Sequence, residues 1–207
     1  MTSRSIIWFR RDLRISDNPA LLAAISESDE IVPVFILDPK LIKTAGSKRL
    51  GYLGQSLHHL DDSLGNNLNV IAGDQVSVLK DLQKQYGAES VHISAEYEPY
   101  GAKRDQVIED AGIKLIRTGS PYAVAPGRVL KPSDNTPYRV YTPFYKAWCV
   151  HGWRKPAEKP KVIPAVKPAS DARSFPDWKL PDNVKITKAG ELAALERFKH
   201  FQKNGLD

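Results

Sequence analysis

Charged side chains follow directly after the first apolar run of the sequence. The run ends at Phe9, and Arg10, Arg11, Asp12 and Arg14 come within the next five residues. If the run is a strand of a doubly wound sheet, these side chains stand at the carboxyl edge, where such sheets bind ligands. They can also pair with nearby carboxylates and lock their own loop. Pairing is the expected role of Arg14, whereas Arg10 fits both roles equally.

The other candidate residues share a position near the end of a predicted strand or at the start of the helix that follows. They are Phe35, Asp38, Arg49, Glu96 and Glu98. Several of them also have a simpler explanation: Phe35 as core, Arg49 with Glu98 as a weak surface pair, and Glu96 as a solvated carboxylate. As a set they are more informative, because the carboxyl ends of parallel strands meet at one edge of a sheet.

Several common catalytic motifs are missing. No G-x-G-x-x-G follows the first apolar run, and no G-x-x-x-x-G-K-[ST], H-E-x-x-H or G-x-S-x-G occurs. The one cysteine, Cys149, excludes an internal disulfide and a C-x-x-C metal site. His58 and His59 are neighbours on a predicted helix and point about 100° apart, so they cannot share a metal ion. We therefore expect no catalytic residue, no metal site, and neither ordinary dinucleotide nor P-loop chemistry.

Short apolar runs alternate with helical patterns over the first part of the chain. The predicted strands are 5–10, 30–37, 68–72, 90–94 and 113–117. The predicted helices between them are 19–25, 47–64, 75–86 and 99–111. This alternation predicts an α/β fold, with a Rossmann-like, doubly wound sheet of five parallel strands and right-handed crossovers. The rules for such folds give the strand order 3-2-1-4-5.

The pattern changes after residue 117. A small hairpin is expected around 129–140 and a short aromatic helix over 143–151. Residues 155–181 contain six prolines, which predicts an extended connector that Phe175 and Trp178 anchor. A helix over 190–204 follows, with apolar residues three apart that must bury against something. These residues are Leu192, Leu195, Phe198 and Phe201.

The composition is that of a globular protein, with 42% hydrophobic and 26% charged residues in 207. The sequence has no secretory signal pattern and no apolar run of the ~18 residues that a membrane span needs. We expect a soluble, cytoplasmic monomer with no membrane partner.

The net charge of +6 and the pI of about 9.3 are compatible with a polyanionic partner. Much of the excess lies on lysines of the Pro-rich stretch, where solvated charges are easily tolerated. Simple solvation is therefore the favoured explanation of the charge, and direct nucleic-acid binding is the alternative.

Four segments, in order across about residues 1–150, resemble the photolyase and cryptochrome family. The first is Trp8-Phe9-Arg10-Arg11-Asp12-Leu13-Arg14 with Ser16-Asp17-Asn18, and the second is Phe35-Ile36-Leu37-Asp38-Pro39. The third is Glu98-Pro99-Tyr100-Gly101 with Lys103-Arg104-Asp105, and the fourth is Tyr138-Arg139-Val140-Tyr141-Thr142-Pro143-Phe144 with Trp148. The helix near 190–204 resembles the start of the family's interdomain region. Together these matches indicate the family more strongly than any one of them.

The resemblance implies an α/β antenna domain over 1–150, a Pro-rich linker over 151–188, and over 189–207 the first helix of a helical region. In the family, reduced FAD in a C-terminal helical domain splits pyrimidine dimers in damaged DNA, and an antenna chromophore in the N-terminal domain passes excitation to it. This chain would lack the FAD domain. That domain and damaged DNA are its expected partners. The chain would be an expressed fragment of a protein more than twice as long. The parent would be a deoxyribodipyrimidine photo-lyase.

Three alternatives remain beside this interpretation. The first is a cryptochrome photoreceptor domain, and the second is a stand-alone nucleotide-binding α/β domain. The third is a structural domain with an empty antenna cleft. The tryptophans resemble no electron relay of the family, so core packing is expected for Trp8 and Trp148.

The resemblance also bears on the antenna. Folate-type members have Asn-Glu where this sequence has Tyr100-Gly101, and a histidine where it has Ala45. These departures make a folate less favoured than 8-hydroxy-5-deazaflavin or FMN.

The resemblance also assigns roles to six cofactor-binding residues. Phe35 would stack on the ring, and Arg10 would line the floor of the pocket. Asp38 and Arg49 would fix polar ring or ribityl groups. Glu96 and Glu98 would accept hydrogen bonds from the ligand.

Overall fold

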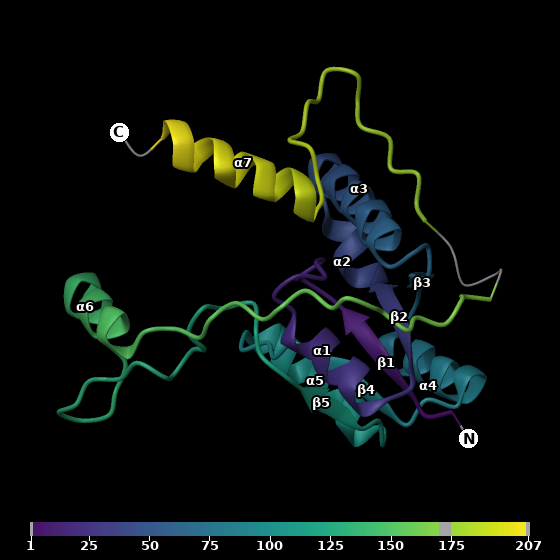
Figure 1. Ribbon diagram of the computed structural model, residues 1–207, viewed down its shortest axis with the longest axis horizontal. Helices are drawn as coiled ribbons and strands as arrows, with labels where there is room; N and C mark the ends of the chain where they lie inside the picture. The colour runs from purple at the N-terminus through teal and green to yellow at the C-terminus, as the bar shows by residue number, and fades with distance from the viewer. Residues whose placement is uncertain (1, 170–174, 206–207) are drawn as a thin grey trace.

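The computed structural model describes residues 2–169 and 175–205, and its centre is one parallel sheet (Figure 1). The strands are β1 (Arg4–Phe9), β2 (Glu30–Leu37), β3 (Asn69–Ala72), β4 (Ser90–Ile93) and β5 (Leu115–Arg117). Their order is β3-β2-β1-β4-β5, and every neighbouring pair is parallel. The predicted fold class and strand order are confirmed.

Helices connect the strands and extend beyond them. They are α1 (Pro19–Glu27), α2 (Pro39–Thr44), α3 (Ser47–Ser63), α4 (Gln75–Tyr86), α5 (Pro99–Asp110), α6 (Tyr141–His151) and α7 (Glu191–Asn204). The sequence interpretation missed α2. Its signal is Asp38-Pro39: the Asp38 carboxylate accepts the Lys40 N–H at 2.8 Å, and Pro39 starts the helix with its φ already suitable.

Side chains on both faces of the sheet are buried, which explains why its strands are continuous apolar runs. One face packs Ile6 and Trp8 of β1 against α4 and Ile108 of α5. The opposite face packs Ile7 and Phe9 against α1 and α3. The helices therefore cover both faces, while the carboxyl ends of the strands stay free for a site.

The Pro-rich connector returns to the sheet and does not hang free. Ile31 of β2 donates its N–H to Pro164 and accepts the N–H of Val166, both at 2.9 Å. Further on, Phe175 stacks on His58 of α3 with ring centroids 4.6 Å apart, and Trp178 packs into the same core. The predicted anchoring by these two aromatic residues is confirmed.

Glycine makes this close packing on α3 possible. A Cβ atom at Gly51 would lie 2.7 Å from Leu180 of the connector, which is too short for any real contact. A side chain at position 51 would therefore require the Leu180 side chain to move.

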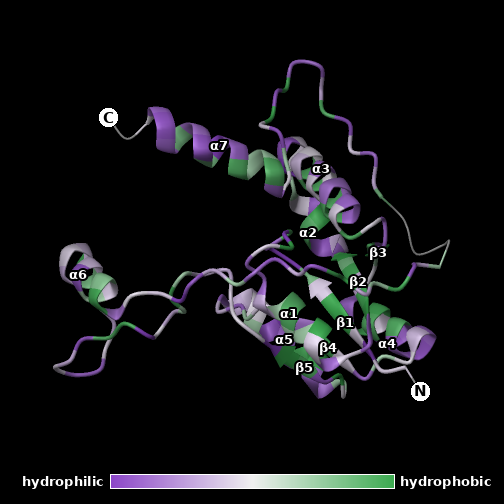
Figure 2. Ribbon diagram, in the orientation of Figure 1, coloured by the Kyte–Doolittle hydropathy of each residue, from purple (hydrophilic) through white to green (hydrophobic). Residues whose placement is uncertain are grey.

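The helices α6 and α7 lie outside the core (Figure 2). Neither of them contains a buried residue. Trp148 of α6 is only half buried and stacks on Trp153 at 4.7 Å. Its predicted core role is wrong, because α6 projects away from the sheet. The predicted hairpin before it is reduced to one antiparallel bridge between Leu130 and Pro137. The apolar side chains of α7 are exposed instead of buried.

The buried His92 of β4 should make stability depend on pH. Burial lowers its pKa, although the Glu27 carboxylate at 3.6 Å opposes the shift, and its Nδ1 has no hydrogen-bond partner among the described residues. Below about pH 6.5 the unfolded chain binds a proton that the folded chain refuses, so stability falls by up to about 1.4 kcal/mol per pH unit.

Urea unfolding between about pH 7 and 5 tests this linkage. Relative to wild type, His92→Leu should show a weaker loss of stability on acidification, whereas the exposed His151→Leu should follow wild type. Parallel curves for all three proteins would show that His92 titrates normally.

Candidate functional site

A cavity of about 310 Å³ opens at the carboxyl edge of the sheet, and we call it the edge cavity. It lies at the ends of β1 and β2, beside the starts of α2, α4 and α5. Its apolar wall consists of Trp8, Phe9, Phe35, Ile36 and Leu41. Its polar wall consists of Arg10, Arg11, Asp38, Gln75, Glu96, Tyr100 and Arg104.

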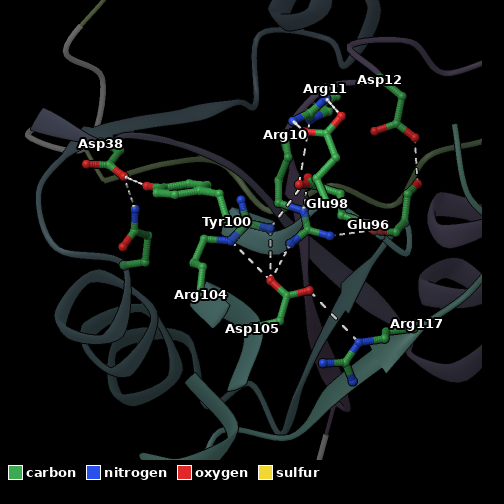
Figure 3. A network of polar contacts seen from close by, with 12 residues as sticks. Arg10, Arg11, Asp12, Asp38, Glu96, Glu98, Tyr100, Arg104, Asp105 and Arg117 are labelled. Atoms are coloured by element: carbon green, nitrogen blue, oxygen red, sulfur yellow. Dashed lines mark hydrogen bonds and ion pairs between the residues drawn. The ribbon is translucent and has the colours of Figure 1, made fainter. Parts of the chain in front are cut away.

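Arg10 forms the floor of the cavity and is almost fully buried, with 5% of its side chain exposed. Its Nη1 lies 2.7 Å from Asp105 and its Nε 3.2 Å from Glu96, while Nη2 donates to the Ser94 carbonyl (Figure 3). Burial lowers the pKa of Arg10, and the neighbouring Arg104 lowers it further, while the two carboxylates oppose the shift. The guanidinium remains charged because the pKa of arginine starts so high.

Asp105 and Glu96 each lie within ion-pair distance of three arginines, and both of them contact Arg10 and Arg104. Asp105, with 3% of its side chain exposed, lies 2.8 Å from Arg104 as well as 2.7 Å from Arg10. Glu96 lies 3.4 Å from Arg104. Two cations and two anions thus neutralise one another away from water, and we call Arg10, Glu96, Arg104 and Asp105 the buried charge cluster.

Trp8 connects this cluster to the apolar wall. The Arg10 and Arg104 guanidinium carbons lie 5.1 Å and 5.0 Å from the Trp8 ring centroid, within cation–π range. Trp8 is buried, as the sequence predicted, and it also lines the cavity. The indole therefore has a fixed position beside any ligand in this cavity.

Asp38 is the centre of a second polar group on the cavity wall. It accepts hydrogen bonds from Gln75 at 2.7 Å, from the Lys40 N–H, and from the Tyr100 hydroxyl. Burial alone would raise the pKa of Asp38, but the hydrogen bonds outweigh it and the pKa is lowered. Burial and the bond to Asp38 raise the pKa of Tyr100. At neutral pH the ionised Asp38 carboxylate therefore accepts a hydrogen bond from the protonated Tyr100 hydroxyl.

Gly101 at the start of α5 leaves room for the Glu96 side chain. A Cβ atom at this position would lie 2.6 Å from a Glu96 carboxylate oxygen and 3.0 Å from its Cβ. A side chain at position 101 would displace Glu96 from the buried charge cluster. The sequence identified Gly101 only as a departure from folate-type members, so this packing role was not foreseen.

Four of the six predicted site residues line the edge cavity: Arg10, Phe35, Asp38 and Glu96. The other two do not. Arg49 is exposed on α3, and Glu98 is half exposed and binds Arg11, with its Oε1 3.0 Å from Nη1. The alternative explanation of Arg49 and Glu98 as a surface pair is therefore wrong, because the Glu98 carboxylate binds Arg11.

The structural role predicted for Arg14 is confirmed. It donates to the carbonyls of Ser16 and Asp17 at 3.0 and 2.8 Å, and lies 3.5 Å from the Asp17 carboxylate.

Residues of the site that were not selected from the sequence include Trp8 as a wall residue, Gln75, Tyr100, Arg104 and Asp105. A signal for two of them existed, since Tyr100 and Arg104 lie four residues apart and so share one face of a helix.

Within the ranges 2–169 and 175–205, no cluster of side chains suits a metal ion. The same ranges contain no helix long and apolar enough to cross a bilayer.

The fold and the edge cavity define a Rossmann-like α/β domain with a ligand-sized cavity at the carboxyl edge of its sheet. The chain belongs to the DNA photolyase family, whose model matches residues 5–164. It is 34% identical over 218 residues to a deoxyribodipyrimidine photo-lyase of Agrobacterium fabrum, covering 97% of this chain and 45% of the relative.

Two further comparisons show the breadth of the family. The crystal structure of a class III photolyase from Agrobacterium tumefaciens has a TM-score of 0.83 and 32% identity, covering 100% of this chain and 46% of that one. Cryptochrome-2 of Gallus gallus is 33% identical over 150 residues, covering 68% of this chain and 26% of the relative. The chain spans about half the length of the photolyases that it matches.

Asp105→Asn should destabilise the protein strongly. Removing one buried carboxylate leaves two buried guanidinium groups facing Glu96 alone, and breaking such a buried pair costs about 3 kcal/mol. Glu109→Gln is the matched control, because this carboxylate pairs with Arg117 nearer the surface at 2.6 Å.

In urea unfolding, the control Glu109→Gln should lower the free energy of unfolding by less than about 1 kcal/mol. Equal losses for the two variants would mean that the buried cluster contributes no more than a surface ion pair.

Proposed function

We propose that this chain is the light-harvesting part of a deoxyribodipyrimidine photo-lyase. The edge cavity holds an antenna chromophore, and excitation passes to FAD bound by the portion of the relatives that this chain does not match. Family membership and the photo-lyase relative support the assignment. The observation that carries it is a cavity of about 310 Å³ with aromatic walls and a buried, neutralised set of charges on its floor.

A planar tricyclic ring fits the chemistry of this cavity. Ligand pockets begin at about 300 Å³ and combine apolar walls with a few directed polar groups. Trp8 and Phe35 provide aromatic surface, while Asp38, Gln75 and Tyr100 provide an acceptor and donors. These residues suit 8-hydroxy-5-deazaflavin or FMN, which when bound would absorb near-ultraviolet or blue light.

Each residue would act on the ligand in a defined way. Phe35 presents its ring face, and Arg10 supports the ring from below because its own N–H groups are already bound. Asp38 accepts a hydrogen bond from the ligand once its hydrogen bond with Tyr100 or Gln75 is broken. Arg49 lies outside the cavity lining, so it meets only a ribityl chain that leaves the cavity toward α3.

Glu96 and Glu98 differ in what they can offer. Glu96 is buried among three arginines and mainly holds those arginines in place. Glu98 is partly exposed at the rim and accepts from a polar ligand group there. Glu96 also takes the space beside Gly101, which leaves no room for the side chain of folate-type members.

A cryptochrome photoreceptor is the second candidate, and the likeness to Cryptochrome-2 of Gallus gallus favours it. The two functions differ in one activity of a polypeptide that carries this chain together with bound FAD. Light-dependent cleavage of pyrimidine dimers in DNA supports the photo-lyase, and stable dimers under continuous illumination support the photoreceptor.

Titration of the chain with 8-hydroxy-5-deazaflavin and then FMN, followed by ligand absorbance and fluorescence, tests the cavity. Wild type should bind at least one of them saturably. Leu41→Trp should weaken binding at least about tenfold, because the indole fills the cavity mouth. Lys43→Trp places the same ring on the same helix outside the cavity lining and should bind as wild type.

Unchanged binding by Leu41→Trp would show that the ligand lies elsewhere, and no binding to either ligand would remove the antenna role from this cavity. Arg49→Ala reports separately on the tail: weaker FMN binding would place the ribityl chain toward α3.

A further inference from the structure

Asp38 differs from the other charged residues that line the edge cavity, because its hydrogen-bond donors are neutral groups. The arginines of the lining are bound by the carboxylates of Glu96, Glu98 and Asp105. Asp38 instead accepts from Gln75, from Tyr100 and from a backbone N–H. It is buried, and it has no ion-pair partner within the described part of the chain. Its charge is therefore available to a ligand.

The two oxygens of this carboxylate have different partners. Oδ1 accepts the Lys40 N–H at 2.8 Å, which is the capping bond that starts α2. Oδ2 accepts from the Gln75 amide at 2.7 Å and from the Tyr100 hydroxyl (Figure 3). One acceptor oxygen is thus shared by two donors, and all three side chains line the edge cavity.

These three groups have fixed positions and fixed protonation states. Asp38 caps α2, Gln75 is the first residue of α4, and Tyr100 is the second residue of α5. Burial raises the pKa of Asp38, but its hydrogen bonds outweigh burial and lower the pKa, so the carboxylate is ionised at neutral pH. Burial and the bond to Asp38 raise the pKa of Tyr100, which therefore remains a donor.

A ligand that replaces these mutual hydrogen bonds must offer a donor to Asp38 and acceptors to Gln75 and Tyr100. An imide, in which one N–H lies between two carbonyl groups, has this pattern, and flavins and 5-deazaflavins carry an imide at one end of the ring. The imide must keep its proton, because a carboxylate without a cationic partner repels an anion. The pterin ring of folate has two adjacent donors, which need both oxygens of a carboxylate, and Oδ1 is already used in the capping bond.

We propose that Asp38, Gln75 and Tyr100 together recognise the imide edge of a flavin-type ring. The imide N–H donates to Asp38, and the two carbonyl groups accept from the Gln75 amide and the Tyr100 hydroxyl. This inference rests on the function proposed for the edge cavity and adds the residues that select its ligand. The aromatic walls suit many flat rings, whereas a mismatched edge leaves buried polar groups unpaired and is rejected.

Titration of the whole chain with FMN and with 3-methyl-FMN, followed by ligand fluorescence, tests the proposal. The methyl group replaces the hydrogen of the imide N–H and leaves both carbonyl groups in place. Wild type should bind FMN, and should bind 3-methyl-FMN at least about tenfold more weakly, because a hydrogen bond to a carboxylate is lost. Folate should also bind more weakly than FMN.

Three variants separate the roles of these side chains. Asp38→Ser keeps a residue that can cap α2, but it removes the carboxylate and leaves space for the methyl group. It should bind FMN at least about tenfold more weakly and prefer FMN over 3-methyl-FMN by less than about threefold. Asp74→Ser makes the same change at the cap of α4, outside the lining of the edge cavity, and should discriminate as wild type does. Tyr100→Phe should weaken the binding of FMN and of 3-methyl-FMN by the same factor of about three, because both ligands keep their carbonyl groups.

Equal binding of FMN and 3-methyl-FMN by wild type would overturn the proposal and leave the antenna role of the cavity intact. Full discrimination by Asp38→Ser, or tighter binding of folate than of FMN, would also overturn it. Failure of FMN alone to bind would contradict imide recognition, since 8-hydroxy-5-deazaflavin has the same edge. Failure of both ligands would remove the antenna role as well.

Discussion

The contact between Arg10 and its two buried carboxylates is the interaction on which the site depends. Arg10 follows β1, Glu96 follows β4, and Asp105 belongs to α5, so three elements meet through one guanidinium. The ladder hydrogen bonds between β1 and β4 stop before this point, and side chains must hold the strand ends together. Because each buried charge is acceptable only beside its partners, the members must be in place together.

This arrangement shapes a cavity more than it adds stability. Buried ion pairs often contribute no more to stability than apolar residues of the same volume, since desolvation offsets their attraction. They do fix the orientation of the side chains, because Arg10 and Arg104 cannot move without breaking an ion pair with Glu96 or Asp105. Trp8 is held beside both guanidinium groups, and Gly101 keeps the space that Glu96 needs. A rigid, polar floor under an aromatic wall is what a planar ligand requires if it is to bind in one orientation.

The fold was predictable from the sequence because its signals are local. Strand runs and helix starts such as Asn18-Pro19 act over a few residues, so the strands and most helices could be predicted, and the rules for doubly wound folds then gave the strand order. The Asp38-Pro39 start of α2 was equally local but was missed.

Only part of the site could be predicted, because the residues that form its ion pairs are far apart in the sequence. Nothing local shows that Arg10 meets Asp105, 95 residues later, or that Arg11 takes Glu98 from Arg49. The expected core role of Trp148 failed for a related reason, since an aromatic residue in a helix does not reveal whether that helix reaches the sheet.

A crystal structure of the chain with bound FMN tests most directly whether the buried charge cluster prepares a chromophore site. Electron density for the ring is expected in the cavity lined by Trp8 and Phe35, with the contacts of Arg10 to Glu96 and Asp105 unchanged. Ring density elsewhere on the chain with the edge cavity empty, or a binding mode that breaks the Arg10 contacts, would contradict this description of the site.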